Sequence, residues 1–213
     1  FKGISYIWIE CLYPSKSNGI NSKLKKGEYY LLEDIRKILA VESKTLLDER
    51  GKAAVAFLYL SGMRRSAFLT LPISCVDLIN YKIYQLPDKG VETKFHKAAI
   101  TSLLRIPDLL EVVKNWDYKV RSVFPDKQTW YAPIRPQRGK SGVFYIAAEK
   151  AGSNREKGFR DELKSLCDRA GIPYRSPHKF RNGHTVYGYK HAKDIKDVKA
   201  ISQNLMHDSI AVT

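Results

Sequence analysis

The sequence predicts a mixed fold that is mainly α-helical and contains one small antiparallel β-sheet. Apolar residues recur at helical spacing in several separate stretches of the chain. Between Cys75 and Ile106 the pattern changes to β-branched and aromatic runs separated by turn residues. The 213 residues are 44% hydrophobic and 28% charged, which is enough apolar material to bury a sizeable core. We therefore expect a globular domain rather than a fibrous or disordered chain.

Three helices are expected in the first part of the chain. The first covers residues 31–39, with Glu33 and Asp34 at the end of a helix that favours acidic side chains. The second, Lys52–Leu60, is followed by Ser61-Gly62 as a stop signal, and the third, Arg64–Leu71, ends at a proline. The apolar positions of the first helix are Leu31, Leu32, Ile35, Ile38 and Leu39.

A small sheet and a longer helix are expected next. The segment Cys75–Ile106 is typical of about three antiparallel strands, with Asn80 and Lys89-Gly90 as turn candidates. Pro107 then opens a helix, because proline is well tolerated at the first helical position.

The remaining part of the chain is expected to be helical after an irregular stretch. Phe124–Gly142 contains three prolines and a basic run, so we expect it to be irregular and exposed. A helix is then expected over Asn154–Arg169, and another follows Ser176, its expected N-cap. A last helix follows Asp194 and is expected to end near His207.

A basic segment divides the chain near its start. Pro14–Gly27 is rich in Ser, Asn, Gly and Lys, contains no acidic residue and has no periodicity. We therefore expect a basic linker over residues 14–29. Residues 1–13 then form the end of an earlier element, and residues 30–213 form the main domain.

The composition points to a polyanionic partner. The chain has 37 Lys plus Arg against 22 Asp plus Glu, a formal net charge of +15. Nucleic acid is the commonest partner of so basic a domain. The three cysteines are odd in number and far apart, which suits a reducing cytosol better than a disulfide framework. The longest apolar run is too short to span a bilayer and the first residues lack the order of a signal peptide, so a secreted or membrane-spanning protein is not expected.

Four patterns in the sequence could bind a phosphate group. His178 and Arg181 are three residues apart and share one face of an expected helix. An imidazole can move a proton near neutral pH, and a guanidinium can hold phosphate oxygens. The simpler alternative is a capping histidine and a solvated arginine. The other patterns are Arg64-Arg65 after a helix stop, Lys94 on a hairpin tip and His207 at a helix end.

Taken in order, these patterns resemble the tyrosine recombinases, also called the phage integrase family. The first conserved box of that family is similar to FLYLSGMRRSAFLTLPISCVDL, and its His-x-x-Arg box is similar to SPHKFRNGHTVYGY. The segment with a Leu-Gly-His core that precedes the family's nucleophile is similar to ISQNLMHDSIAVT. The resemblance covers residues 30–213 and implies the family's catalytic-domain fold. It also implies that residues 1–13 are the tail of a helical core-binding domain.

The resemblance implies a set of roles around one scissile phosphate. In the family a tyrosine attacks this phosphate, forms a 3′-phosphotyrosyl link and releases a 5′-hydroxyl without a metal, ATP or another cofactor. The residues that match the family's pocket are Arg64, Lys94, His178, Arg181 and His207, with Lys97 as the alternative to Lys94. Further cations expected to contact DNA are Arg65, Lys97, Lys179, Lys23, Lys25 and Lys26. The sequence itself has no common zinc spacing and no phosphate-binding glycine loop.

The sequence also departs from the family pattern. Ala67 stands where the family often has an acidic residue, and Asn182 follows the second arginine in place of a histidine. Met206 replaces the usual glycine before the last histidine. The nucleophilic tyrosine is expected a few residues past Thr213, so the expected domain over residues 30–213 lacks it and we name no nucleophile.

The resemblance implies a site-specific DNA recombinase or integrase that is cytoplasmic and associated with DNA. Its partners would be a double-stranded recombination site and further copies of itself, as a tetramer of two dimers on DNA. Without the exchanged C-terminal segment, the chain alone is expected to be a monomer. The main alternative is a non-catalytic DNA-binding protein of the same fold that lacks the nucleophile. A helical scaffold that binds RNA would explain the charge but not the ordered patterns.

Overall fold

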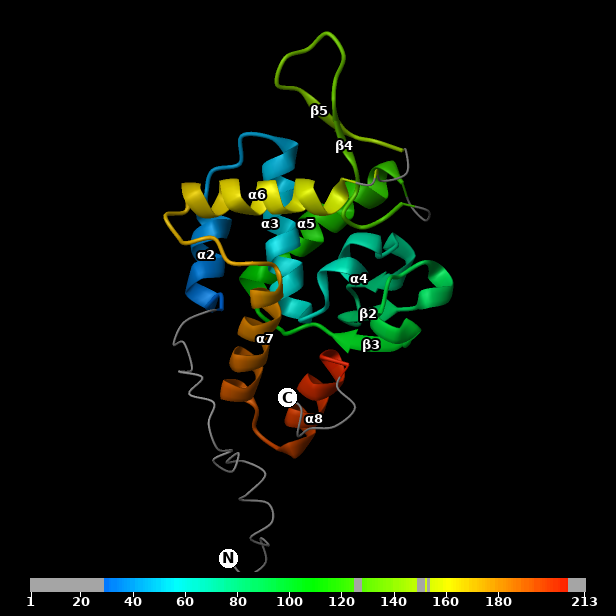
Figure 1. Ribbon diagram of the computed structural model, residues 1–213, viewed down its shortest axis with the longest axis vertical. Helices are drawn as coiled ribbons and strands as arrows, with labels where there is room; N and C mark the ends of the chain where they lie inside the picture. Colours follow the sequence, from blue (N-terminus) through cyan, green and yellow to red (C-terminus); the bar gives the residue numbers. More distant parts are fainter. Residues whose placement is uncertain (1–28, 125–127, 149–151, 153, 207–213) are drawn as a thin grey trace, which may run out of the picture.

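The computed structural model describes residues 29–124, 128–148, 152 and 154–206, and these residues form a mainly helical fold with small antiparallel sheets (Figure 1). The helices are α2 (Leu32–Ala40), α3 (Leu46–Ser61), α4 (Arg65–Thr70), α5 (Pro107–Val123), α6 (Arg155–Arg169), α7 (His178–His191) and α8 (Ile195–Asn204). The strands are β1 (Val76–Asp77), β2 (Lys82–Gln85), β3 (Ala99–Ser102), β4 (Ile134–Pro136) and β5 (Phe144–Ile146). The predicted fold class is confirmed. None of the described helices is both long and apolar enough to cross a membrane.

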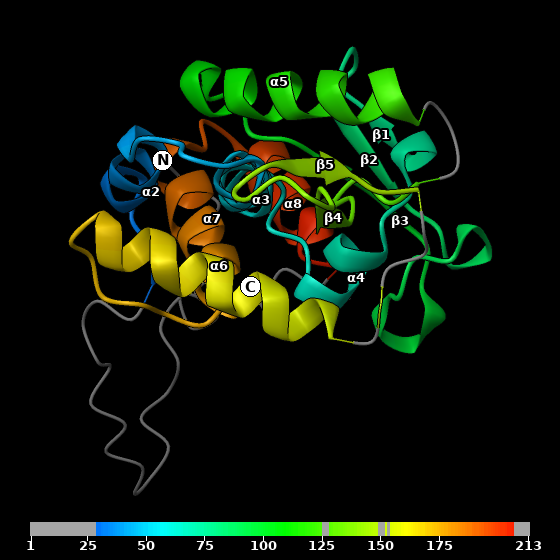
Figure 2. The same cartoon turned by 90° about the horizontal axis from the view of Figure 1, so that it is seen from above.

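Helix α3 runs through the centre of the fold, and α2, α5, α6 and α7 pack around it (Figure 2). The run Ala53–Leu60 is buried on every side, which explains why this helix lacks a polar face. The helix begins at Leu46 rather than at the expected Lys52. The reason is a capping box, in which the Thr45 side chain accepts a hydrogen bond from the Asp48 backbone N–H.

An aromatic cluster joins α3 and α4 to the segment before β4 and to α6. The rings of Phe57 and Trp130 lie 4.5 Å apart between centroids. Phe68 contacts Trp130, Tyr131 and Phe159 at centroid distances between 5.7 and 6.0 Å. Because all five side chains are 2% exposed or less, this cluster is the part of the core that holds α4 in place.

The expected sheet between Cys75 and Ile106 is confirmed as three antiparallel strands in the order β1-β2-β3. Ile83 at the centre of β2 pairs with Val76 on one side and Thr101 on the other, and it is fully buried. Helix α5 begins at Pro107, as expected. The loop between β2 and β3 contains two short 3₁₀ turns, η2 (Pro87–Lys89) and η3 (Lys94–His96), and a third, η1 (Ile73–Cys75), precedes β1.

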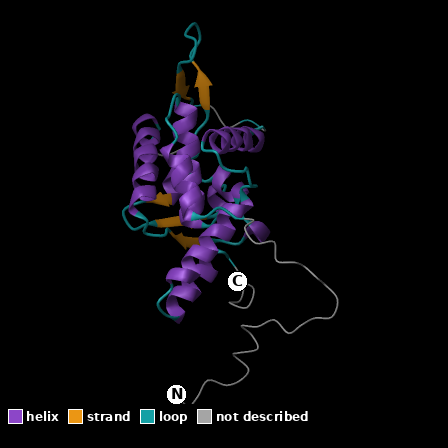
Figure 3. Ribbon diagram, turned by 90° about the vertical axis from the view of Figure 1, so that its left-hand side faces the viewer, coloured by secondary structure: helices purple, strands orange, loops and turns teal. Residues whose placement is uncertain are grey.

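The prediction for Phe124–Gly142 is wrong in two respects. Trp130 and Ala132 are fully buried, and Ile134–Pro136 forms strand β4, which pairs with β5. The resulting hairpin projects from the body of the molecule (Figures 1 and 3). The prolines and the basic run pointed to an irregular loop, whereas aromatic burial against the core fixes the start of this segment.

The ends of the last two helices differ slightly from expectation. Helix α7 begins at His178 with Pro177 at the N-cap position, so Ser176 is not the cap. Helix α8 begins after Asp194, as expected, but it ends at Asn204. The Asp194 side chain accepts hydrogen bonds from two backbone N–H groups, which caps the helix. Several predicted features lie outside the described residues. They are the element over residues 1–13, the part 14–28 of the linker predicted over 14–29, with Lys23, Lys25 and Lys26, and also His207.

Candidate functional site

Three of the predicted site residues come together where α3 ends and where α4 and α7 begin. Arg64 is the N-cap residue of α4 and directly follows the turn that closes α3. His178 and Arg181 lie on the first turn of α7 (Figure 1). Arg181 donates a hydrogen bond to the carbonyl oxygen of Gly62, two positions before Arg64. The positive charges of Arg181 and Arg64 both lower the pKa of His178.

Arg181 forms the floor of this site. Its side chain is 5% exposed, and Nη1 donates a hydrogen bond to the carbonyl oxygen of Gly62 at 2.8 Å. Nη2 donates to the carbonyl oxygen of Leu205, just after α8. Burial, and then repulsion by Arg64, lowers the pKa of Arg181 to about 10, so the group keeps its charge at neutral pH. The alternative of a solvated arginine is wrong, because this guanidinium is buried and fixed by two backbone carbonyls.

The turn at Gly62 sets the position of Arg64. Gly62 has φ +62°, and its N–H donates to the carbonyl oxygen of Leu58 at 2.9 Å to close α3. A Cβ atom at this position would lie 2.6 Å from Cδ2 of His184. Glycine is therefore required at position 62 for two reasons. Its backbone is left-handed, and α7 approaches too closely for a Cβ atom.

His178 stands at the exposed side of the site. The residue as a whole is exposed to solvent. The pKa of its imidazole is lowered, first by partial burial of the ring and then by the positive charges of Arg181, Arg64 and Lys179. The imidazole is therefore neutral at neutral pH and can accept a proton. A bound anion would offset the repulsion and favour the protonated form.

Lys94 lies on the loop between β2 and β3, which is bonded to the helix that Arg64 caps. Two hydrogen bonds tie its loop to α4: Ser66 Oγ donates to the Glu92 carbonyl at 3.3 Å, and the Glu92 N–H donates to Thr70 Oγ1 at 2.8 Å. Lys94 itself is exposed, and its ammonium lies 4.6 Å from the ring centroid of Phe95. Lys97 is exposed on the same loop. The loop thus borders the site, while both lysines point to solvent-accessible positions.

The remaining sequence predictions have mixed outcomes. Arg65 is half-buried and forms an ion pair with Glu156 of α6 at 2.8 Å, so it links α4 to α6. Lys179 is half-buried next to His178. Ala67 is 1% exposed, so an acidic side chain there would lie in the core. Met206 adopts φ +52°, the left-handed conformation that suits the family's usual glycine.

Two buried polar residues support the site and were not predicted from the sequence. His184 is fully buried, and its Nδ1 lies 2.9 Å from the carbonyl oxygen of Tyr59 near the end of α3. Burial lowers its pKa to about 4. The Asn204 amide accepts from the N–H of Ser102 and donates to its carbonyl oxygen, both at 2.8 Å. His184 shares the helical face of Arg181, which was a usable signal, but no local pattern marks Asn204.

The arrangement is that of an anion site with a neutral base at its edge. Two guanidiniums and one imidazole lie close enough to repel one another, and a bound anion would relieve that repulsion. Within the described residues, no three His, Cys, Asp or Glu side chains gather in the manner of metal ligands. The groups present can hold a phosphate and accept a proton.

Comparison with known proteins identifies relatives of the fold. The phage integrase family matches residues 30–213. Among solved structures, XerA recombinase is similar with a TM-score of 0.60 and 19% sequence identity, covering 94% of this chain and 60% of that one. An integrase from mycobacterium phage Brujita has a TM-score of 0.53 and 16% identity, covering 95% of this chain and 59% of that one.

A DNA complex is also among the similar structures. The Tn1549 transposon integrase in complex with a circular intermediate DNA has a TM-score of 0.56 and 14% identity, covering 91% of this chain and 62% of that one. The chain thus spans about 60% of the length of these proteins. No curated protein matches the chain.

Proposed function

Because this chain belongs to the phage integrase family, we propose that it is the catalytic part of a site-specific DNA recombinase or integrase. The observation that carries the proposal is the fixed placement of Arg181, which bonds the carbonyls of Gly62 and Leu205 beside Arg64 and His178. A phosphodiester is an anion with two non-bridging oxygens, and paired guanidiniums are suited to bind such a group.

In the proposed reaction, the phenol oxygen of a tyrosine encoded after Thr213 attacks the scissile phosphorus. His178 accepts the phenol proton or positions the phosphate, and the bond from phosphorus to the 5′-oxygen breaks. Lys94, or Lys97 on the same loop, protonates the leaving 5′-oxygen, and His207 adds a hydrogen bond to the phosphate. The products are a 3′-phosphotyrosyl link and a free 5′-hydroxyl.

Arg64 and Arg181 supply the main stabilisation in this scheme. Negative charge accumulates on the non-bridging oxygens as phosphorus becomes pentacoordinate, and fixed cations stabilise that charge most when they need no rearrangement. Loss of one such donor typically costs about 3–4 kcal/mol in the barrier. The buried and doubly hydrogen-bonded state of Arg181 meets the requirement for a fixed cation.

Rejoining follows by the reverse step. The 5′-hydroxyl of a partner strand attacks the phosphotyrosine, the DNA backbone is restored and the tyrosine leaves. One phosphodiester is exchanged for another through the covalent link, so the scheme needs no ATP. The net charge of +15 supports double-stranded DNA as the partner, and we propose a tetramer of two dimers on the recombination site.

The test is a search for the covalent intermediate. The complete reading frame is expressed past Thr213 and incubated with labelled duplexes from the ends of the DNA element that encodes it, each nicked near the expected cut. A protein–DNA adduct that resists denaturant is expected, and it should disappear when the tyrosine after Thr213 is replaced by Phe. A frame without a tyrosine in that stretch, combined with tight DNA binding, would instead favour the non-catalytic DNA-binding protein.

A further inference from the structure

A second basic surface lies away from the candidate phosphate site. The β4–β5 hairpin, residues 134–146, projects beyond α6 at the end of the molecule opposite α8 (Figures 1 and 3). We call these residues the β4–β5 arm. Every residue from 135 to 143 is exposed. The stretch from Pro133 to Ala148 contains Arg135, Arg138 and Lys140 and no acidic residue.

The tip of the arm is surrounded by open space. Gly139 and Gly142 have φ of +78° and +73°, so the loop closes without a strained side chain. The Gln137 N–H donates to the carbonyl oxygen of Val143 at 2.7 Å, which completes the turn. A Cβ atom at either glycine would meet nothing within 4 Å. The tip therefore has a defined backbone, and within the part of the chain that the structure describes no neighbouring element covers its two glycines.

The root of the arm is held firmly by the core. Ile134 and Ile146 pair across the two strands and pack against the hydrophobic core. Just before β4, Arg50 Nη1 donates to the carbonyl oxygen of Ala132 at 2.7 Å from the centre of the fold. A rigid base beneath an exposed tip limits the entropy lost when the tip binds a partner.

A chain of contacts connects this root to the candidate phosphate site. Arg65, which follows Arg64, forms an ion pair with Glu156 on α6. The neighbouring Arg155 donates hydrogen bonds to Thr129 Oγ1 and to the carbonyl oxygen of Tyr131, in the segment that leads into β4. These contacts link the root of the arm, through α6, to the residue that follows the first arginine of the site.

The root is itself basic. A cavity of about 190 Å³ there is lined by Arg50, Arg135 and Arg155, and Glu162 pairs with Arg50. Arg135 lies opposite Tyr145 in the hairpin, on the face that alternates with the core-facing Ile134. The outward face thus carries a cation and an aromatic ring, and Arg138 and Lys140 follow in the exposed loop toward the tip.

We propose that the β4–β5 arm binds the sugar-phosphate backbone of duplex DNA outside the scissile phosphate. The partner follows from the chemistry of the tip, which presents cations, glycine, serine and glutamine rather than a large apolar patch. Such a surface fits a polyanion of regular charge spacing and reads no base sequence. The inference rests on the proposed function, in that it assumes a chain that binds duplex DNA.

The test measures binding of the 213-residue chain to a labelled random-sequence duplex of about 40 base pairs over a series of salt concentrations, because phosphate contacts need no target sequence. The double variant Arg138→Gln with Lys140→Gln removes two exposed cations from the tip. We expect the affinity to fall on the order of tenfold, and the slope of log K against log salt to decrease by about 2.

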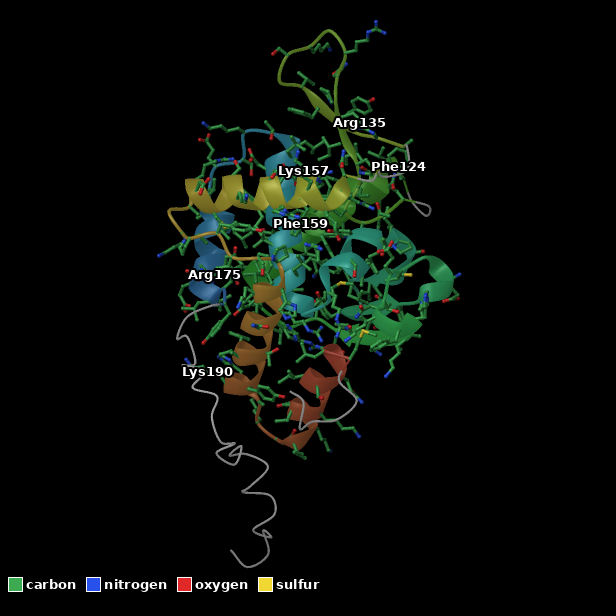
Figure 4. All side chains as sticks on the ribbon, in the orientation of Figure 1. Phe124, Arg135, Lys157, Phe159, Arg175 and Lys190 are labelled. Atoms are coloured by element: carbon green, nitrogen blue, oxygen red, sulfur yellow. The ribbon has the colours of Figure 1, made fainter. Side chains whose placement is uncertain are left out.

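Two further variants make the result specific. Lys190→Gln with Lys196→Gln removes the same charge from α7 and α8, at the opposite end of the molecule from Arg135 (Figure 4). This pair should keep nearly the wild-type slope. Arg138→Lys with Lys140→Arg keeps the charge of the tip and should restore wild-type binding. Unchanged melting temperatures show that each variant is folded.

Each outcome bears on one of the two proposals. A smaller slope of log K against log salt in the tip variant, with no such change in the control variant, supports the arm as a DNA contact. Equal losses in the tip and control variants would overturn it, since only net charge would then matter. Wild-type binding by the tip variant would also overturn it, while leaving the recombinase proposal intact. A wild-type chain that fails to bind duplex DNA would contradict the proposed function itself. If the tip variant instead lost binding to RNA or to anionic vesicles more than to duplex DNA, the arm would be assigned to that other partner.

Discussion

The two sides of the candidate phosphate site are built differently. On the buried side, Arg181, His184 and Asn204 each bond to backbone atoms of another element, and none is more than 6% exposed. On the open side, Arg64 is half-buried and His178 and Lys94 are exposed. The buried side is therefore organised before any ligand arrives, whereas the groups of the open side would gain partners from the DNA proposed above. Substitutions on the two sides should separate the stability of the fold from its chemistry.

The largest effects are expected from Arg181→Ala and Arg64→Ala in the complete enzyme. Each should slow DNA cleavage by about 10²–10³-fold, because each removes one guanidinium from the charged phosphate. Only Arg181→Ala should also lower the free energy of unfolding, by about 1–3 kcal/mol, because the carbonyls of Gly62 and Leu205 lose their donor. Cleavage rates and urea unfolding measure the two effects.

Urea unfolding of the 213-residue chain alone is the control for this pair. If Arg64→Ala lost as much unfolding free energy as Arg181→Ala, the distinction between the two sides would not hold. Arg181→Lys keeps the charge but not the two-pronged geometry, so it should recover little of either loss.

The second effect is a dependence of stability on pH. Burial lowers the pKa of His184 from 6.5 to about 4, so between these values the unfolded chain binds a proton that the folded chain does not. The free energy of unfolding therefore falls as the pH falls through this window, by roughly 3 kcal/mol in total. Urea unfolding at about pH 7 and about pH 4 should show a smaller fall in His184→Phe than in the wild type.

The carboxylates of the chain also lose stability in acid, so the difference between variants is the quantity that matters. His96→Gln, on the exposed β2–β3 loop, should keep the full wild-type fall. If the free energy of unfolding fell equally with pH in His184→Phe and in the wild type, His184 would have to be protonated in the folded state.

A smaller effect is expected from Asn204→Leu. This change removes both hydrogen bonds to Ser102 and leaves the backbone groups of β3 without partners, at a cost of about 2 kcal/mol in the free energy of unfolding. The Ser102 amide should also exchange its hydrogen faster. Gln203→Ala at the exposed neighbouring position is the matched control, and a similar loss there would show that α8 is merely sensitive to substitution.

The smallest expected effect is a gain in the free energy of unfolding, from a substitution at Met206. Met206 holds φ +52°, a conformation that costs a side chain about 1 kcal/mol and glycine nothing. Met206→Gly should therefore raise the free energy of unfolding by about 0.5–1 kcal/mol, measured by urea titration. Met206→Ala keeps a Cβ atom and should bring no gain. A loss of stability in the glycine variant would show that the packing of the methionine outweighs the strain.

The features that could be predicted from the sequence are those set by neighbouring residues. The stop at Gly62, the start of α5 at Pro107 and the start of α8 after Asp194 each depend on one residue's backbone preference or side chain. His178 and Arg181 could be placed together because they are three positions apart on a helix.

The features that could not be predicted depend on contacts between distant residues. Ser102 and Asn204 are 102 positions apart, and nothing near either residue indicates the pair. The β4–β5 hairpin was missed because its prolines and glycines favour a loop locally, whereas the burial of Trp130 is decided by the aromatic cluster. The exposed position of Lys94 likewise depends on how its loop bonds to α4.

The bonds of Arg181 have a consequence for how this protein is made. Arg181 reaches back 119 positions to Gly62 and forward 24 positions to Leu205. During translation the earlier elements leave the ribosome first, so α3 and α4 emerge long before α7 and α8. Until the last helices emerge, a nascent chain carries Arg64 without Arg181. The order of synthesis thus means that a partly made chain does not hold the assembled candidate site.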